Sequence, residues 1–199
     1  MSDSLGGVSR ETLDKLEQFR ALIVEENRLH NLVSAAAIDS LWGRHILDSA
    51  QLAHLGPPKA SWVDIGSGAG LPGIVVACLI DGPVRLIEPR RLRADFLRRA
   101  IGQLSLHSVT VDCAKAERVT GQFDVITARA VAVLDRLLGI GAHLSHPGTI
   151  WVLPKGKNAK SELAEAQLNW HCAVREVTSV TDPAATILVL SDVKAKRRR

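Results

Sequence analysis

The sequence predicts an α/β protein with a mostly parallel, seven-stranded sheet, helices on both faces and an N-terminal helical extension. Apolar residues recur at three-to-four spacing through the first part of the chain, which is typical of amphipathic helices. From residue 61 on, short apolar runs alternate with helical segments, as in βαβ units. A glycine-rich turn separates the first of these strands from the helix that follows it.

The chain divides into three parts. Residues 1–58 form the helical extension, with apolar periodicity over residues 13–32, Ser9 as a plausible N-cap, and a second helix over residues 38–55. Gly56-Pro57-Pro58 ends that helix, because proline cannot continue it. Residues 59–192 form the α/β domain, and residues 193–199 form a basic tail.

Within the α/β domain, apolar runs predict the strands and apolar faces predict the helices. We expect strands over residues 62–65, 84–88, 109–111, 123–127, 149–153, 174–180 and 187–190. We expect helices over residues 71–80, 92–104, 133–143 and 161–169. This alternation favours parallel pairing, because each crossover helix returns the chain to the same end of the sheet.

Composition excludes several classes of protein. Of the 199 residues, 46% are hydrophobic and 23% are charged, which are ordinary globular values. The longest apolar run, residues 74–80, is too short to cross a membrane, and the first ten residues show no secretory signal. The three cysteines are widely spaced and odd in number, which argues against a disulfide framework or a zinc ribbon. We expect a soluble, cytoplasmic monomer without a membrane or metal partner.

Positive charge gathers in two places along a chain whose formal net charge is +4. The last seven residues hold five Lys and Arg and no acid. A second cluster, within residues 90–99, places five arginines around Asp95. Such segments either contact nucleic acid or form a solvated, solubilising surface, and charge alone leaves both interpretations open.

The loop after the first strand carries the strongest chemical signal. Residues 64–73 read DIGSGAGLPG and lie at the carboxyl end of a strand, where open α/β sheets bind ligands. A dinucleotide loop reads GxGxxG, but Leu71 takes the place of the third glycine. The spacing GxGxG, with Glu88 ending the next strand, resembles the S-adenosylmethionine loop of Rossmann-like methyltransferases. A carboxylate at Glu88 can accept hydrogen bonds from ribose hydroxyls. A dinucleotide loop and a turn needed only for packing are the alternatives.

Motifs that the sequence lacks narrow the range of atoms that could accept a methyl group. Methylation at a pyrimidine C5 needs a cysteine nucleophile, and none of the three cysteines follows a proline. Enzymes that methylate an exocyclic amine usually contain an Asn/Asp-Pro-Pro-aromatic motif, which is absent from this sequence. Methylation of a ribose 2′-hydroxyl needs a base or a lysine to take its proton, and the sequence shows no convincing set of such residues. Guanine N7 has an exposed lone pair and no proton to lose, so orientation alone can suffice.

Five landmarks in register resemble the RsmG/GidB family of 16S ribosomal RNA guanine-N7 methyltransferases. They are Asn31-Leu32-Val33, His45-Ile46-Leu47-Asp48-Ser49, residues 64–73, residues 123–130 and Lys155-Gly156. The likeness runs from about residue 31 to residue 190. The chain departs from the family pattern at Glu88-Pro89-Arg90, at Ala128 and at Pro154.

The resemblance implies a class I methyltransferase fold. It also implies methyl transfer from S-adenosyl-L-methionine to N7 of one guanine in the decoding-region loop of 16S rRNA, guanine 527 in the family. Arg129 would line the methyl-transfer site and contact the cofactor. The other cofactor contacts would be Gly66, Gly68, Gly70, Leu71, Glu88, Ala116 and Glu117. The rRNA or the small ribosomal subunit would contact Asn31, His45, Asp48, Ser49, Lys155 and Gly156.

Structural roles are the alternatives for several of these residues. His45 and Asp48 are neighbours on one helix face and can serve as a local hydrogen-bonded pair. Arg129 can instead form an ion pair with Asp124 or Asp135. For the whole protein, a non-catalytic RNA-binding Rossmann-like module and a small-molecule methyltransferase remain as alternative functions.

Overall fold

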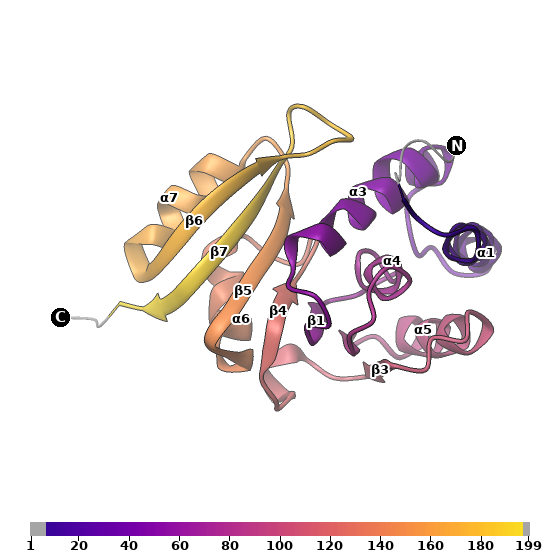
Figure 1. The fold of residues 1–199 in the computed structure, drawn as a ribbon, viewed down its shortest axis with the longest axis horizontal. Coiled ribbons are helices and arrows are strands. Elements are labelled where there is room, and N and C mark those ends of the chain that lie inside the picture. The colour runs from indigo at the N-terminus through magenta and orange to yellow at the C-terminus, as the bar shows by residue number, and fades with distance from the viewer. Residues whose placement is uncertain (1–6, 197–199) are drawn as a thin grey trace.

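Seven strands form one twisted sheet in the computed structural model, which describes residues 7–196 (Figure 1). The strand order is β3-β2-β1-β4-β5-β7-β6. Strand β7 is antiparallel to both of its neighbours, and all other pairs are parallel. The predicted α/β fold with a mostly parallel, seven-stranded sheet is therefore confirmed.

The strands match the expected ones in number and order but differ in length. They span β1 Trp62–Ile65, β2 Val84–Ile87, β3 Val109–Asp112, β4 Phe123–Thr127, β5 Ser145–Lys155, β6 Trp170–Thr178 and β7 Thr186–Ala195. The last three differ most from the prediction, because β6 and β7 pair as a long hairpin from Trp170–Ala195 to Thr178–Thr186. In β7 the apolar run of residues 187–190 marked only the buried part of the strand. No residue of β6 is fully buried, so its bounds left little apolar signal.

Helices cover both faces of the sheet (Figure 1). One face carries α1 Arg10–Asn27, α2 Ala35–Asp39, η2 Leu41–Ile46, α3 Leu47–Ala50, η3 Gln51–Leu55, α4 Gly73–Ala77 and α5 Arg91–Gln103. The other face carries η4 Ala116–Arg118, α6 Leu134–Gly141, η5 Ala142–Leu144 and α7 Ala159–Asn169. Alternate residues of β1 serve the two cores, with Trp62 in the first and Val63 in the second.

The N-terminal segment packs into the first of these cores. The side chains of Leu16, Phe19 and Ile23 on α1 are fully buried together with residues of β1 and β2. Ser9 caps α1 by accepting a hydrogen bond from the backbone N–H of Thr12. Helix α1 ends earlier than the apolar spacing suggests, and the Asn27 side chain then accepts a hydrogen bond from the backbone N–H of Val33.

Two predicted helices take a different form. The segment expected as one helix over residues 38–55 starts at Ala35 and changes type along its length, with a π-helical stretch at η2 and a 3₁₀ stretch at η3. The helix expected over residues 71–80 is only α4, five residues long. It is short because residues before Gly73 belong to the glycine loop, in which the Gly70 N–H donates to the Ser67 carbonyl at 2.7 Å.

Strand β7 continues to Ala195, so it takes in the first three residues of the segment delimited above as a basic tail. Lys196 follows, and Arg197–Arg199 lie outside the described residues. No helix in residues 7–196 is long and apolar enough to cross a membrane.

Candidate active site

The glycine loop connects β1 to α4 at the carboxyl edge of the sheet. Gly66, Gly68 and Gly70 all adopt positive φ angles, of 71°, 56° and 85°. Side chains rarely tolerate this conformation, so glycine is needed at each of the three positions. The backbone N–H groups of Gly66 and Ser67 donate to the Ile87 carbonyl at 2.8 and 3.0 Å, which attaches the loop to the end of β2.

Of the three glycines, Gly68 is the one at which an added Cβ atom would meet no steric clash. A Cβ atom at Gly66 would lie 2.6 Å from Val131, and one at Gly70 would lie 2.9 Å from the ring of Phe19. At Gly68 the nearest atoms, on Arg93 and Gly66, lie 3.7 and 3.8 Å away. Gly66 and Gly70 therefore pack against protein, while the backbone at Gly68 is accessible to a ligand. Leu71 is buried in the first core, so its side chain faces away from that space.

Glu88 lies directly after β2, beside the glycine loop, and its side chain is hydrogen-bonded to the loop. Its carboxylate accepts a hydrogen bond from the Gly68 N–H at 2.9 Å and another from the Arg90 N–H at 2.8 Å. The residue is only 3% exposed. Each carboxylate oxygen keeps a second acceptor site, so Glu88 can hold the loop and still accept a hydrogen bond from a ribose hydroxyl.

Asp64, at the end of β1, is buried beneath the loop. One carboxylate oxygen accepts a hydrogen bond from the Gly73 N–H at 3.1 Å, and Oδ1 has no partner among the described residues. Burial raises the pKa of Asp64 to about 7, although the neighbouring Ser67 hydroxyl, the Gly73 N–H and the charge of Arg129 act in the opposite direction. Asp64 is therefore a buried carboxyl that supports the loop from below.

Arg129 follows β4 and reaches the N-terminal segment. Its Nη1 lies 2.9 Å from Nδ1 of His45. Arginine has only donors, so His45 Nδ1 must be the acceptor and its proton resides on Nε2. Burial and the positive charge of Arg129 lower the pKa of His45, which agrees with a neutral ring. Burial also lowers the pKa of the Arg129 guanidinium, whereas the carboxylates of Asp48 and Asp64 raise it.

Arg129 therefore lies between the glycine loop and the N-terminal segment. It does not form the structural ion pair with Asp124 or Asp135 that the sequence left open as an alternative. Asp124 instead accepts hydrogen bonds from Ser61 and His146, and these contacts lower its pKa. Asp135 accepts from Asn169 and Trp170. The tertiary structure thus brings together His45, Asp48 and Arg129, three of the predicted site residues.

Asp48 holds the turn between β6 and β7 against α3. Its Oδ1 accepts hydrogen bonds from Gln51 Nε2, Ser179 Oγ and Thr181 Oγ1 at 2.8, 3.1 and 2.9 Å. The Gln51 Oε1 also accepts a hydrogen bond from the backbone N–H of Val180 in the same turn. The three donors were not among the predicted site residues. Ser179 and Thr181 lie 131 and 133 residues from Asp48 in the chain, so no local motif links them to it.

Beside this network, the surface forms a groove of about 350 Å³. Its walls come from α2, η2, α3 and the β6–β7 turn, and they include Arg44, His45, Asp48, Thr181 and Asp182. Because His45 also contacts Arg129, the groove adjoins the residue that lies beside the glycine loop.

The remaining predicted RNA contacts are placed differently. Asn31 is exposed, but Ser49 is buried and donates to the His45 carbonyl at 2.6 Å. Lys155 donates to Glu162 at 2.8 Å, and its side chain is 11% exposed. Gly156 is exposed, and its carbonyl accepts from Ala159 at the start of α7. The Lys155 ammonium is thus occupied by an internal ion pair, and its contact with a phosphate stays a prediction.

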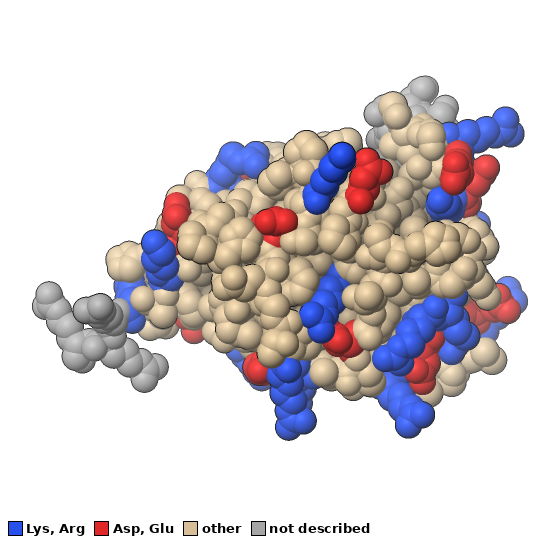
Figure 2. Space-filling view, turned by 60° about the horizontal axis from the view of Figure 1, so that its bottom comes forward, with Lys and Arg blue, Asp and Glu red and all other residues tan. Residues whose placement is uncertain are grey.

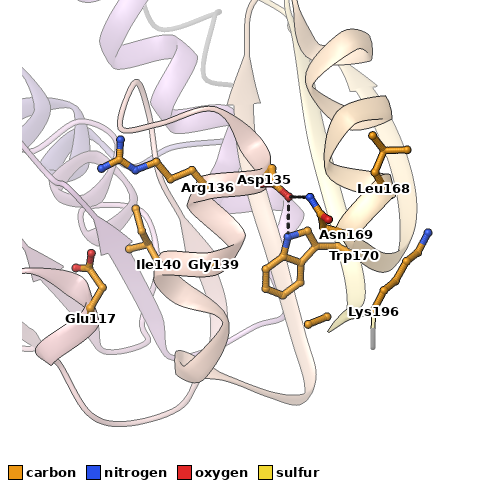
Figure 3. A pocket seen from close by; sticks show the side chains of 10 residues that line it. Glu117, Asp135, Arg136, Gly139, Ile140, Leu168, Asn169, Trp170 and Lys196 are labelled. Carbon is orange, nitrogen blue, oxygen red and sulfur yellow. Dashed lines mark hydrogen bonds between the residues drawn. The ribbon is translucent and has the colours of Figure 1, made fainter. Parts of the chain in front are cut away.

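Ala116 and Glu117 form η4 on the face that carries α6. Ala116 is buried in the second core, and Glu117 is exposed. Glu117 also borders a groove of about 590 Å³ between α6, the end of α7 and the end of β7 (Figure 3). None of the described residues that line this groove belongs to the glycine loop. This groove is therefore separate from the glycine loop.

The strand order, the GxGxG loop with its accessible Gly68 and the acid after β2 together define a class I, S-adenosylmethionine-dependent methyltransferase. The family model of GidB, rRNA small subunit methyltransferase G, matches residues 12–187. The chain belongs to this family.

Two curated relatives are similar to almost the whole chain. Ribosomal RNA small subunit methyltransferase G of Zymomonas mobilis is 42% identical over 203 residues, covering 97% of this chain and 91% of the relative. The protein of the same name from a Ruegeria species is 43% identical, covering 98% and 99%. Among solved structures, a SAM-dependent methyltransferase from Aquifex aeolicus shares the fold, with a TM-score of 0.58, 14% identity and coverage of 72% and 88%.

Proposed function

We propose that this protein transfers a methyl group from S-adenosylmethionine to N7 of one guanine in 16S rRNA. The observation that carries the proposal is the position of Arg129 between the accessible glycine loop and the groove that His45 and Asp48 line. This arrangement supports binding of the cofactor at the loop and of a base in the groove, with a fixed cation between them. The names of the family and of its curated relatives support rRNA of the small subunit as the substrate.

The chemistry of N7 methylation suits the side chains at this site. S-adenosylmethionine supplies an electrophilic methyl group on a sulfonium. Guanine N7 offers a lone pair and loses no proton, so the enzyme needs no general base. A neutral His45 that already accepts a hydrogen bond from Arg129 fits a positioning role. Holding two reactants at attack distance and orientation can supply roughly 7–11 kcal/mol of the barrier reduction.

We infer the following roles for the loop and its surroundings. The Gly68 backbone and Glu88 bind the cofactor, Asp64 supports the loop from below, and Arg129 positions the reacting groups. Gly66, Gly70 and Leu71 shape the loop, and the segment at Ala116 and Glu117 borders the adenine. A cytoplasmic monomer that acts on the 16S rRNA or the small subunit stays a prediction.

The arginines of α5 offer weaker support for RNA contact. Arg91 and Arg98 flank Asp95, and Arg99 contacts Glu26. On the face drawn in Figure 2, Lys and Arg side chains are interspersed with Asp and Glu rather than gathered in one patch. Such exposed pairs resemble an ordinary solvated surface. The proposal therefore does not depend on the α5 arginines.

Methyl transfer into small subunits that lack the modification tests the proposal. Purified protein is incubated with S-adenosylmethionine carrying a labelled methyl group, and the rRNA is then digested to nucleosides. We expect label in 7-methylguanosine. Gly68→Val should abolish transfer, because its side chain would enter the accessible space at a positive φ.

Gly102→Ala is the matched control, because Gly102 has no atom of the described residues within 4 Å of the added Cβ. It should leave transfer unchanged. Label in another nucleoside would contradict the proposed acceptor atom. Cofactor binding without any label would contradict the proposed substrate.

A further inference from the structure

The groove beside Asp48 has the chemistry to recognise one particular base. Its walls present a carboxylate at Asp48, a second carboxylate at Asp182 and a guanidinium at Arg44, whose Nη2 lies 3.9 Å from Asp182. A volume of about 350 Å³ lies at the lower end of the range for small-molecule pockets. The groove thus has the size and polarity of a site for a single unstacked base.

The Asp48 carboxylate is held in one orientation. Three donors, from Gln51, Ser179 and Thr181, all converge on Oδ1. No hydrogen bond from residues 7–196 reaches Oδ2, although Asp48 lines the groove. A carboxylate that is anchored through one oxygen presents the other as a fixed acceptor. Fixed acceptors contribute to specificity because little conformational freedom is lost when they bind.

Guanine is the base whose Watson–Crick edge matches such an acceptor. Its N1–H and N2 amino group are adjacent donors, and its O6 is an acceptor. Enzymes that act on a base in RNA commonly extrude it and read this edge by hydrogen bonds. N7 lies on the other side of the purine ring system. A guanine bound to Asp48 through its Watson–Crick edge therefore leaves N7 free to react.

We propose that Asp48 is the specificity-determining residue of this enzyme, accepting hydrogen bonds from the N1–H and N2 amino group of the target guanine. This inference rests on the proposed function, since it assumes that a guanine of rRNA is the substrate. Arg44, on the same groove, is placed to donate to O6. A site built around a buried hydrogen bond strongly rejects an analogue that lacks the partner group.

Inosine provides the test, because it keeps N7, N1–H and O6 but lacks the N2 amino group. Small subunits are reconstituted with 16S rRNA carrying either guanosine or inosine at the position that the wild-type enzyme methylates. The rates of transfer are compared as kcat/KM. We expect the wild type to favour guanosine by roughly 10- to 100-fold, the effect of one hydrogen bond to a charged group.

Asp48→Asn separates recognition from structure. The asparagine oxygen can still accept the bonds from Ser179 and Thr181, but the amide nitrogen that replaces Oδ2 cannot accept one. We expect this variant to bind S-adenosylmethionine normally and to lose activity on guanosine, so that its preference for guanosine over inosine falls to about one. Ser179→Ala is the control: it weakens the turn but keeps the carboxylate, so both rates should fall together.

The outcomes distinguish the inference from the proposed function. A wild-type enzyme that methylates guanosine and inosine equally overturns the inference and leaves the proposed function intact. An Asp48→Asn variant that keeps the wild-type preference for guanosine over inosine also overturns the inference and leaves the proposed function intact. The wild-type measurement needs no variant, so a folding defect in Asp48→Asn does not remove the test. A wild-type enzyme that places no label on guanosine subunits overturns the proposed function, and the inference with it.

Discussion

Glu88 illustrates how one residue combines a structural and a ligand-binding role. Both of its oxygens accept backbone N–H groups, at Gly68 and Arg90. At the same time it lies directly after β2, beside the loop, where we propose that the ribose lies. Removing the side chain would therefore affect both the shape of the loop and its affinity for the cofactor.

We predict that Glu88→Ala weakens S-adenosylmethionine binding by roughly 1.5–3 kcal/mol, the usual cost of losing hydrogen bonds to a charged group. That is about tenfold or more in Kd, measurable by isothermal titration calorimetry. Glu88→Gln keeps one acceptor oxygen, so its affinity for S-adenosylmethionine should lie between those of the wild type and Glu88→Ala. Glu165→Ala, at an exposed position on α7, is the control. Equal affinity of wild type and Glu88→Ala would refute the assignment.

The buried Asp64 makes stability depend on pH. Its folded-state pKa, about 7, exceeds its ordinary value of 3.8. Between these values the folded state holds a proton that the unfolded state has released, so this residue makes stability fall as pH rises through the window. Asp64→Asn keeps an acceptor for the Gly73 N–H but removes the charge.

We predict that Asp64→Asn gains stability relative to the wild type as the pH rises from about 5 to about 7.5, over the window in which the wild-type carboxyl ionises. Urea unfolding of both proteins at the two pH values measures this difference. Parallel changes in the free energy of unfolding for the two proteins would show that Asp64 does not titrate in this window.

At the scale of elements, α1 supports the glycine loop directly. The Phe19 ring is fully buried and lies where it blocks any side chain at Gly70. The contact of Phe19 with Gly70 thus couples the N-terminal segment to the cofactor loop. Sequence periodicity identified an apolar face on this helix but not the surface against which it packs.

We predict that Phe19→Ala lowers the free energy of unfolding by about 3–5 kcal/mol and also weakens S-adenosylmethionine binding, because the loop loses its support. Leu16→Ala is the matched control, since Leu16 is equally buried on α1 but is not among the atoms nearest Gly70. It should destabilise the protein without changing cofactor affinity. If both variants bind the cofactor equally well, the proposed coupling is wrong.

At the scale of the whole molecule, the distribution of charge bears on RNA binding. Strand β7 ends at Ala195, so deletion of Arg197–Arg199 removes three positive charges without shortening the strand. If each arginine neutralises one phosphate of single-stranded RNA, the slope of log K against log salt should fall by about 2.

We predict this smaller slope for the deletion variant, measured by filter binding of small subunits at several salt concentrations. Cofactor affinity and the free energy of unfolding are the controls and should not change. An unchanged slope would assign the three arginines to solubility rather than to RNA contact.

The features predicted best from the sequence are those made by residues close together in the chain. Strand β4 begins and ends where the apolar run does, and the spacing of Gly66, Gly68 and Gly70 matches three positive φ angles. Helix α4 and the β6–β7 hairpin were predicted less well. The loop uses residues that an apolar pattern assigns to the helix, β7 extends beyond its buried residues, and β6 has no fully buried residue.

The sequence by itself determined the class of sheet, the position of the cofactor loop and the acid that holds it, because each depends on local conformation and on alternation along a strand. Only the tertiary structure decided which distant groups meet. His45 and Arg129 are 84 residues apart, and Asp48 and Ser179 are 131 apart. Their contacts result from packing the N-terminal segment against the sheet edge, and periodicity does not encode which buried surfaces will face each other.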